Sequence, residues 1–92
     1  MAQTTVVISD DHVLVRHGIR KVLEESNAYQ VVGEASDAEE TIKLVRELKP
    51  QVLILDLGLP SKSGLEILYQ LREEKIPVTT VVLTMHENEL MI

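Results

Sequence analysis

The sequence predicts a doubly wound α/β domain built on a parallel sheet. Short segments rich in β-branched residues alternate with segments of helical period, in the order βαβαβαβ with short connections. The third strand-like segment, QVLIL at 51–55, has the nearly continuous apolar character of a strand buried on both faces. Right-handed crossovers are therefore expected to place helices on both faces of the sheet.

Four short, β-branched segments are expected to form the strands. They are TTVVIS at 4–9, YQVVGEA at 29–35, QVLIL at 51–55 and VTTVVLT at 78–84. Ligands in open α/β sheets bind at the carboxyl ends of the strands. The residues that end these four segments are therefore the first candidates for a functional site.

Apolar periodicity predicts helices between the strands. The second of them is expected to begin at Asp37 as N-cap, with Glu40 as its capping-box partner, and to end before Pro50. The third is expected from about Gly64 to Glu74. The residues expected on inward faces are Leu14, Val15, Gly18, Ile19, Val22 and Leu23 in the first helix, Ile42, Val45 and Leu48 in the second, and Leu65, Leu68 and Leu71 in the third.

Length and composition narrow the class of protein. The chain has 92 residues, of which 45% are apolar, which is enough for one domain with a core of its own. A net charge of −6 and the lack of a basic run disfavour nucleic-acid binding by this chain alone. There is no cysteine, no signal peptide and no apolar run long enough to span a membrane, so we expect a soluble cytoplasmic domain.

Three carboxylates are expected to meet at one edge of the sheet. Asp10 and Asp11 follow the first strand, and Asp56 follows the third. If these two strands are neighbours, the carboxylates converge, and two like charges about 4 Å apart repel by roughly 4 kcal/mol at an effective dielectric constant of about 20. Either one carboxyl group is protonated or a cation lies among them. Oxygen ligands without cysteine favour Mg²⁺ as that cation.

This arrangement suits phosphoryl chemistry. With a cation screening the approach of two anions, Asp56 could act as a nucleophile towards phosphorus. Thr84 ends the fourth strand segment and could donate its hydroxyl to a phosphoryl oxygen. We therefore hypothesise phosphorylation on Asp56. The simpler alternative is that these are turn and cap residues, with Asp11 capping the first helix and Asp10 pointing to solvent.

The same segments resemble the receiver domain of bacterial two-component response regulators, and most of all those of the NarL/FixJ (LuxR-type) class. The resemblance runs from about Thr5 to the end of the chain and includes the acid pair, the strand-end threonine and the signature D-x-x-x-P-x-x-x-G at Asp56, Pro60 and Gly64. It implies a flavodoxin-like sheet with strand order 2-1-3-4. It also implies a phosphoacceptor switch rather than an ordinary enzyme, since the family catalyses only its own phosphotransfer and dephosphorylation.

The resemblance assigns roles to single residues. Asp56 would accept the phosphoryl group from a sensor histidine kinase, a phosphotransfer protein or a small phosphodonor. Mg²⁺ would be bound by Asp11 and Asp56 directly, by Asp10 through water and by the backbone carbonyl of Gly58. Thr84 would be the switch hydroxyl, whereas Pro60 and Gly64 would shape the loop and start the third helix. The output would be DNA binding by a separate domain that controls transcription.

The resemblance also implies that residues 1–92 are an incomplete receiver domain. The family's fifth strand and fifth helix, with the lysine that pairs with the phosphoryl group, would lie beyond Ile92, and Lys62 and Lys75 stand in the wrong places to replace that lysine. The edge of the fourth strand would then be open to self-association or strand swapping. Phosphorylation of Asp56 is expected to be poor in this form.

Several alternatives remain open. A phosphorylation-independent pseudo-receiver or scaffold module is the main alternative function, whereas a haloacid-dehalogenase-type phosphatase would need an aspartate where Gly58 stands. His86 would border the phosphorylation site, and with Gly58 offering no cover the aspartyl phosphate would be short-lived; otherwise neither residue affects its lifetime. His12 and His17 are expected to be surface or loop residues. The first helix is also expected to carry a basic face, which is either a docking site or simply solvated. This face is formed by Arg16, His17, Arg20 and Lys21.

Overall fold

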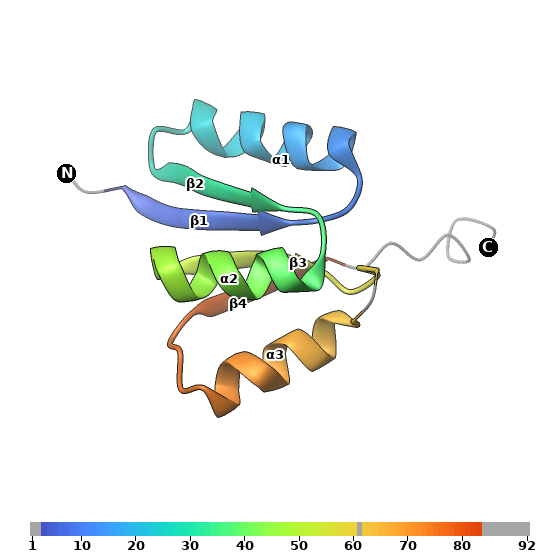
Figure 1. Ribbon diagram of the computed structural model, residues 1–92. Coiled ribbons are helices and arrows are strands. Elements are labelled where there is room, and N and C mark those ends of the chain that lie inside the picture. Colours follow the sequence, from blue (N-terminus) through green and yellow to red (C-terminus); the bar gives the residue numbers. More distant parts are fainter. Residues whose placement is uncertain (1–2, 61, 84–92) are drawn as a thin grey trace, which may run out of the picture.

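The structure is a computed structural model that describes residues 3–60 and 62–83. Strands and helices alternate along this part of the chain, and the strands form one parallel sheet in the order β2-β1-β3-β4 (Figure 1). Both the doubly wound class and the strand order are as predicted. The elements are β1 (Thr4–Ser9), α1 (Val13–Glu25), β2 (Tyr29–Ala35), α2 (Ala38–Leu48), β3 (Val52–Asp56), α3 (Gly64–Glu73) and β4 (Thr79–Leu83).

The two central strands, β1 and β3, end side by side. Ser9 at the end of β1 pairs with Leu55, the residue before Asp56 in β3. Asp10 follows Ser9 directly, so the register brings Asp10 and Asp56 to the same level of the sheet. This placement follows from the parallel pairing of β1, which Asp10 follows directly, with β3, which ends at Asp56.

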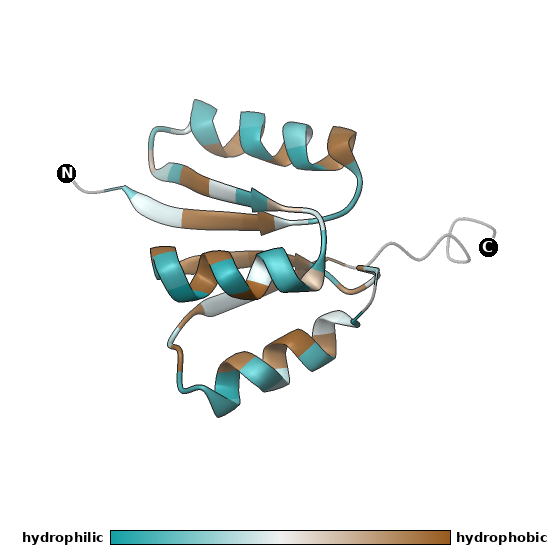
Figure 2. Cartoon of the chain, viewed as in Figure 1, coloured by the Kyte–Doolittle hydropathy of each residue, from teal (hydrophilic) through white to brown (hydrophobic). Residues whose placement is uncertain are grey.

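Side chains of the central strands alternate between two separate cores. Val7 of β1 packs on the side of α2 and α3, whereas its neighbours Val6 and Ile8 pack on the side of α1. Figure 2 shows β1 as mostly apolar, while the helices carry apolar and polar bands in alternation. The larger core consists of Val7, Ala38, Ile42, Val45, Leu53, Leu55, Leu59, Ile67 and Leu71.

Helix α1 is attached more loosely than the other helices. Ile19 and Leu23 pack against the sheet, but none of the residues of α1 is buried. Leu14 is 85% exposed and Val22 is 68% exposed, although both belong to the apolar face predicted from periodicity. The predicted stripe is therefore real, but only part of it contacts the sheet within the described residues.

The inward face of α3 differs from the prediction at one position. Leu65 was expected to face inward and is 67% exposed, whereas Ile67 is fully buried. Gly64, Ile67 and Leu71 are the buried positions of this helix, and they are spaced by three and four residues as one helical face requires. Leu68 packs at the margin of the core, so the predicted stripe was wrong only for Leu65.

Local signals set the helix ends. The Asp37 side chain accepts a hydrogen bond of 2.8 Å from the backbone N–H of Glu40, which confirms it as the N-cap of α2. The Glu40 carboxylate accepts a hydrogen bond from the backbone N–H of Ser36, whereas a capping box would require one from the N–H of Asp37. Ser63 caps α3 in the same way, by accepting from the N–H of Glu66.

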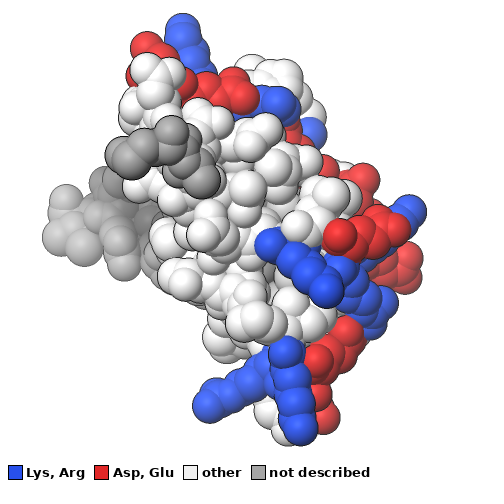
Figure 3. Space-filling view, turned by 90° about the vertical axis from the view of Figure 1, so that its left-hand side faces the viewer, with Lys and Arg blue, Asp and Glu red and all other residues white. Residues whose placement is uncertain are grey.

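The surface carries charges of both signs. Figure 3 shows the edge formed by the amino ends of the strands, where Lys and Arg lie beside Asp and Glu around an uncharged middle. This view therefore shows no continuous basic stripe of the kind that tracks a phosphate backbone. Within the part of the chain that the structure describes, no helix is both long enough and apolar enough to cross a membrane.

Candidate functional site

Three carboxylates and one imidazole meet at the carboxyl ends of β1 and β3. Asp10, Asp11, His12 and Asp56 each offer one ligand atom, and these atoms lie within 4.8 Å of one another. Asp10 and Asp56 are buried, with 1% and 5% of their surface exposed, whereas Asp11 and His12 face solvent. The convergence of the three acids agrees with the sequence prediction, and we call these four residues the acidic cluster.

Asp10 is fixed by its backbone and by its side chain. Its N–H donates to the carbonyl of Ala35 (3.0 Å), and its carbonyl accepts from the Arg16 guanidinium (2.7 Å). Its carboxylate Oδ1 accepts from the backbone N–H of His12 at 2.8 Å. His12, not Asp11, is the N-cap residue of α1, and Asp10 is buried. The alternative in which Asp11 caps the helix and Asp10 points to solvent is therefore wrong.

Asp56 is oriented by the turn that follows it. Its Oδ1 accepts a hydrogen bond of 2.9 Å from the backbone N–H of Gly58, which leaves Oδ2 directed towards the acidic cluster. A Cβ placed on Gly58 would meet only this same Oδ1, at 3.6 Å, among atoms within 4 Å. Among the described residues, no other heavy atom therefore lies within 4 Å of that position.

His12 is the residue that the sequence prediction placed incompletely. It is exposed, as expected, but its Nδ1 lies 2.8 Å from Asp10 Oδ1, 3.1 Å from Asp11 Oδ1 and 4.0 Å from Asp56 Oδ2. The pKa of His12 lies above its ordinary value of 6.5. The main cause is the hydrogen bond to Asp10, followed by the negative charge of Asp11, while burial opposes the rise. Its position directly after the acid pair was the available signal.

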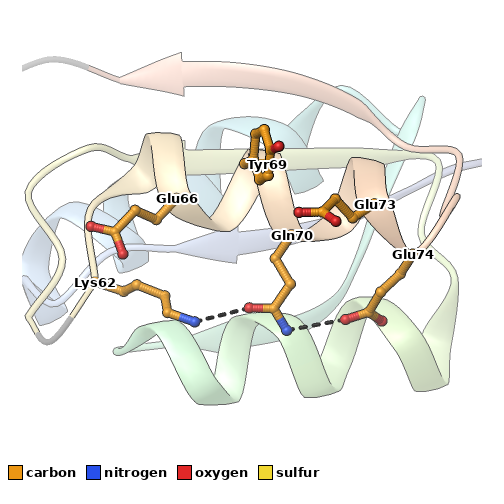
Figure 4. Close-up of a pocket in the computed structure, with 6 residues that line it drawn as sticks. All are labelled: Lys62, Glu66, Tyr69, Gln70, Glu73 and Glu74. Atoms are coloured by element: carbon orange, nitrogen blue, oxygen red, sulfur yellow. Dashed lines mark hydrogen bonds between the residues drawn. The ribbon is translucent and has the colours of Figure 1, made fainter.

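The lysine nearest to the site in sequence is engaged elsewhere. Lys62 donates to the side chain of Gln70 (2.9 Å), which in turn donates to Glu74 (3.0 Å) along the outer surface of α3 (Figure 4). None of the residues around this surface hollow belongs to the acidic cluster. This agrees with the expectation that Lys62 does not supply a positive charge to the cluster.

The loop after Asp56 is shaped by a close approach between backbones. The N–H of Gly64 donates to the carbonyl of Leu57 (3.2 Å). A Cβ on Gly64 would lie 2.6 Å from Leu57 Cδ2, 3.0 Å from Leu57 Cα and 3.3 Å from the carbonyl oxygen of Asp56. The start of α3 therefore has room only for glycine. Pro60 is exposed within the same loop.

Part of the basic face of α1 is occupied by internal contacts. Arg16 and Arg20 both donate to the carboxylate of Glu34 in β2. Burial by itself raises the pKa of Glu34, but hydrogen bonds from Arg20 and Arg16 outweigh it and lower the pKa below its ordinary value. Arg20 is still 43% exposed, and His17 and Lys21 are exposed as well, so these three can act as solvated or docking residues. The predictions for Thr84 and His86 lie outside the described residues.

The donor set fits a small divalent cation. Carboxylate oxygens are the ligands that Mg²⁺ takes from proteins, usually one or two directly, with waters completing the octahedron. Here three carboxylates lie together at an edge that is partly open to water, which suits such an ion. Without a positive charge nearby, the three carboxylates of the cluster would lower the stability of the fold, because like charges at this separation repel. The chemistry of the donor set therefore agrees with the Mg²⁺ site expected from the sequence.

Comparison with known proteins identifies the family. Residues 6–92 match the family described as "Response regulator receiver domain". The chain therefore belongs to the response regulator receiver domains, and its relatives include response regulators of the NarL and LuxR type. Receiver domains are signalling switches rather than classic enzymes, and they bind Mg²⁺ at an acidic pocket, the place that the acidic cluster takes here.

Three similar proteins illustrate the match. The transcriptional regulatory protein YdfI of Bacillus subtilis is 36% identical over 87 residues, which cover 95% of this chain and 41% of that protein. The receiver domain of the putative response regulator NarL from Mycobacterium tuberculosis has a TM-score of 0.90 at 30% identity, covering 95% of this chain and 70% of that one. The Salmonella typhimurium RcsB response regulator has a TM-score of 0.85 at 35% identity, covering 94% and 44%. The chain spans 39% to 41% of the length of the first curated relatives that it matches.

Proposed function

We propose that the chain is a phosphoacceptor switch in which Asp56 receives a phosphoryl group from a sensor histidine kinase, a phosphotransfer protein or a small phosphodonor. The observation that carries this proposal is the placement of Asp56. Its carboxylate is buried, is held by the Gly58 N–H and lies beside two further aspartates. A side chain that served only as a turn or cap residue would not need these acidic neighbours.

In the proposed transfer, a carboxylate oxygen of Asp56 attacks phosphorus. An O–P bond forms while the N–P bond of a phosphohistidine donor breaks, and the leaving imidazole nitrogen keeps the electron pair and takes a proton from solvent. The Gly58 N–H holds Oδ1 during this step, so the carboxylate does not have to find its orientation at the moment of reaction. Because Gly58 has no side chain, the donor would approach on that side of the carboxylate.

Asp11 and Asp56 would hold Mg²⁺ directly, with Asp10 acting through water and the Gly58 carbonyl as a further ligand. When bound, the ion would neutralise the acidic cluster and the phosphoryl oxygens. Arg16 supports this arrangement from behind, since it binds the Asp10 carbonyl at 2.7 Å and so fixes the backbone from which the acid pair projects. The carboxylates of the acidic cluster, not Arg16, would provide the affinity for Mg²⁺.

Phosphorylation of Asp56 would be transmitted through the fourth strand. The N–H of Leu57 donates to the carbonyl of Leu83 (3.3 Å), which links the residue after Asp56 to the residue before Thr84. The Thr84 hydroxyl would then bind a phosphoryl oxygen and move the segment that follows it. Pro60 and Gly64 would keep the loop on the other side in shape. His86 would border the phosphoryl group, and with no side chain at Gly58 the aspartyl phosphate would be short-lived.

The output is proposed to be control of transcription through a DNA-binding domain of a longer protein. YdfI is named a transcriptional regulatory protein, and the RcsB structure concerns interaction with DNA. The acidic surface of this chain, with its net charge of −6, argues that it does not bind DNA itself. A receiver that served only as a scaffold would not need Asp56 for its output, and that difference can be measured.

The experiment is phosphorylation of the chain by acetyl phosphate with Mg²⁺. Intact mass spectrometry is expected to show the mass of one added phosphoryl group in a fraction of the wild-type chains and in none of the Asp56→Asn chains. Asp37→Asn is the matched control, because it removes the same charge from another loop at this edge while asparagine still caps α2. Beryllofluoride with Mg²⁺ should perturb the NMR signals of residues 10–12 and 56–58.

Two results would contradict the proposal. Equal labelling of the wild type and Asp56→Asn would place the phosphoryl group elsewhere. No labelling together with no beryllofluoride binding would favour a scaffold module that works without phosphorylation.

Self-association through β4 is a further part of the proposal. Among the described residues β4 pairs only with β3, and Val81 and Val82 are 48% and 40% exposed. An unpaired apolar edge can pair with the same edge of a second copy. Sedimentation velocity should show concentration-dependent dimers that Val81→Lys suppresses. A strictly monomeric wild type would contradict this part.

A further inference from the structure

The His12 ring lies among the carboxylates although most of the residue faces solvent. Its Nδ1 is 2.8 Å from Asp10 Oδ1 and 3.1 Å from Asp11 Oδ1, while its backbone N–H is held by the same Asp10 oxygen. The residue stands at the N-cap of α1 with extended backbone angles, φ −96 and ψ 109. The ring is therefore attached to a backbone that is anchored to the acidic cluster.

The spacing of the four donors is close to that of a metal centre. One nitrogen and three carboxylate oxygens lie within 4.8 Å of one another. Ligands about 2.0–2.2 Å from a common ion lie within roughly 4.4 Å of each other. Asp11 and His12 are exposed, whereas the carboxylates of Asp10 and Asp56 are each held by a backbone N–H, so any adjustment to an ion would fall on Asp11 and His12.

We propose that His12 is a fourth protein ligand of this centre, through Nδ1, and that it makes the centre prefer divalent transition ions such as Co²⁺ and Zn²⁺ over Mg²⁺. The inference rests on the proposed function, because it assumes that the acidic cluster holds a divalent cation. Mg²⁺ favours oxygen ligands, whereas an imidazole nitrogen suits the ions that lie later in the first transition row. One nitrogen among oxygen ligands therefore raises the affinity for these ions relative to that for Mg²⁺.

A second role for the same geometry makes the opposite prediction. If His12 acted only as a cation that pairs with the carboxylates, an arriving metal ion would displace it. Removing the imidazole would then raise the affinity for every divalent ion or leave it unchanged. A ligand role requires instead that removal weakens Co²⁺ and Zn²⁺ binding and spares Mg²⁺ binding.

The test measures the dissociation constants of Mg²⁺, Co²⁺ and Zn²⁺ by calorimetry on the full chain at one fixed pH. For His12→Ala we expect Co²⁺ and Zn²⁺ affinities roughly 10- to 100-fold weaker and an Mg²⁺ affinity within about twofold of the wild type. His17→Ala is the matched control, since it removes an exposed histidine within α1 that does not belong to the acidic cluster. This control should bind all three ions like the wild type.

Spectroscopy reports directly on whether His12 is a ligand. Zn²⁺ should shift the Nδ1 resonance of His12, and the visible absorption of bound Co²⁺ should change between wild type and His12→Ala. If Mg²⁺ binds and His12→Ala leaves the Co²⁺ affinity unchanged, the inference is overturned while the proposed function stands. If no divalent ion binds the wild type, the inference and the Mg²⁺-dependent function both fail.

Discussion

Arg16 connects three elements of the structure with one side chain. Its guanidinium binds the carbonyl of Asp10 after β1 and the carboxylate of Glu34 in β2, while its backbone belongs to α1. The Arg16 and Glu34 side chains are only 15% and 18% exposed, so these contacts are less screened than those of a surface pair. Arg16 therefore stabilises the backbone beneath the acidic cluster.

Replacing Arg16 should lower the free energy of unfolding more than replacing Arg20, the arginine one helical turn later. Arg16→Met is expected to lower the free energy of unfolding by about 2 kcal/mol, because a part-buried charged hydrogen bond to Asp10 and one to Glu34 are lost. Arg20→Met is the control. Its side chain is 43% exposed, so we expect a loss of less than about 1 kcal/mol. Urea denaturation measures both, and equal losses would contradict this role for Arg16.

Glu34 should contribute to the loss of stability in acid. Its pKa in the folded protein lies below the ordinary 4.5, because the hydrogen bonds from Arg20 and Arg16 outweigh the effect of burial. A lowered folded-state pKa stabilises the fold above the unfolded-state pKa, and that contribution disappears as the pH falls through the folded-state value.

The stability of the wild type should therefore fall with pH below about 4.5, and Glu34→Gln should show a shallower decline. Chemical denaturation at a series of pH values measures the two slopes. Glu24→Gln is the control, since Glu24 is 49% exposed and pairs with Arg20 across one turn. Identical slopes for wild type and Glu34→Gln would rule this contribution out.

The sequence predicts the acids of the site better than it predicts the histidine. Asp10 and Asp56 end neighbouring parallel strands, so strand patterns alone bring them together. The place of His12 depends instead on the N-cap geometry of α1 and on a hydrogen bond to Asp10, and neither follows from residue spacing. The contact between Arg16 and the Asp10 carbonyl is likewise invisible in a pattern of charges.

At the level of elements, each of the three helices in the described residues is followed by a residue with positive φ that is not glycine. Asn27 follows α1, Lys49 ends α2, and Lys75 follows α3, with φ of 61, 46 and 57. A left-handed backbone is unfavourable for residues with a Cβ, and asparagine tolerates it better than lysine. The two lysines therefore hold conformations that glycine would adopt with less strain.

Glycine at the end of α2 should stabilise the protein. Lys49→Gly is expected to raise the free energy of unfolding by about 0.5–1 kcal/mol, because relief of the left-handed strain exceeds the added freedom of the unfolded chain. Lys43→Gly is the control, since it places glycine at an exposed position inside the same helix and should cost about 1 kcal/mol. Thermal unfolding of the two variants should shift in opposite directions, and a loss for Lys49→Gly would contradict the argument.

Elements were predictable where local chemistry specifies them. β-Branched runs gave the strands to within a residue or two, and Asp37 and Pro50 marked the ends of α2. The inward face of α3 was harder, because both Leu65 and Ile67 are apolar and stand at helical spacing from other leucines, Leu65 three residues before Leu68 and Ile67 four residues before Leu71. In the structure Ile67 is buried and Leu65 is exposed.

At the scale of the whole molecule, the two faces of the sheet are unequal. One face carries α2 and α3 over the larger core, while the other carries α1 (Figure 1). None of the residues of α1 is buried. Stability depends on the apolar area that each element removes from water. The face under α2 and α3 should therefore hold most of the folding free energy, and α1 should open more readily.

The same substitution on the two faces tests this asymmetry. Leu53→Ala removes a fully buried side chain from the larger core and is expected to cost about 3 kcal/mol, whereas Leu23→Ala on the half-buried face of α1 should cost about 1 kcal/mol. Hydrogen exchange of the wild type supplies the second measurement. Amides of α1 should exchange through local opening, well before those of β1 and β3, which require global unfolding. Equal costs together with equal protection would mean that α1 is held as firmly as the central strands, by contacts beyond its half-buried face.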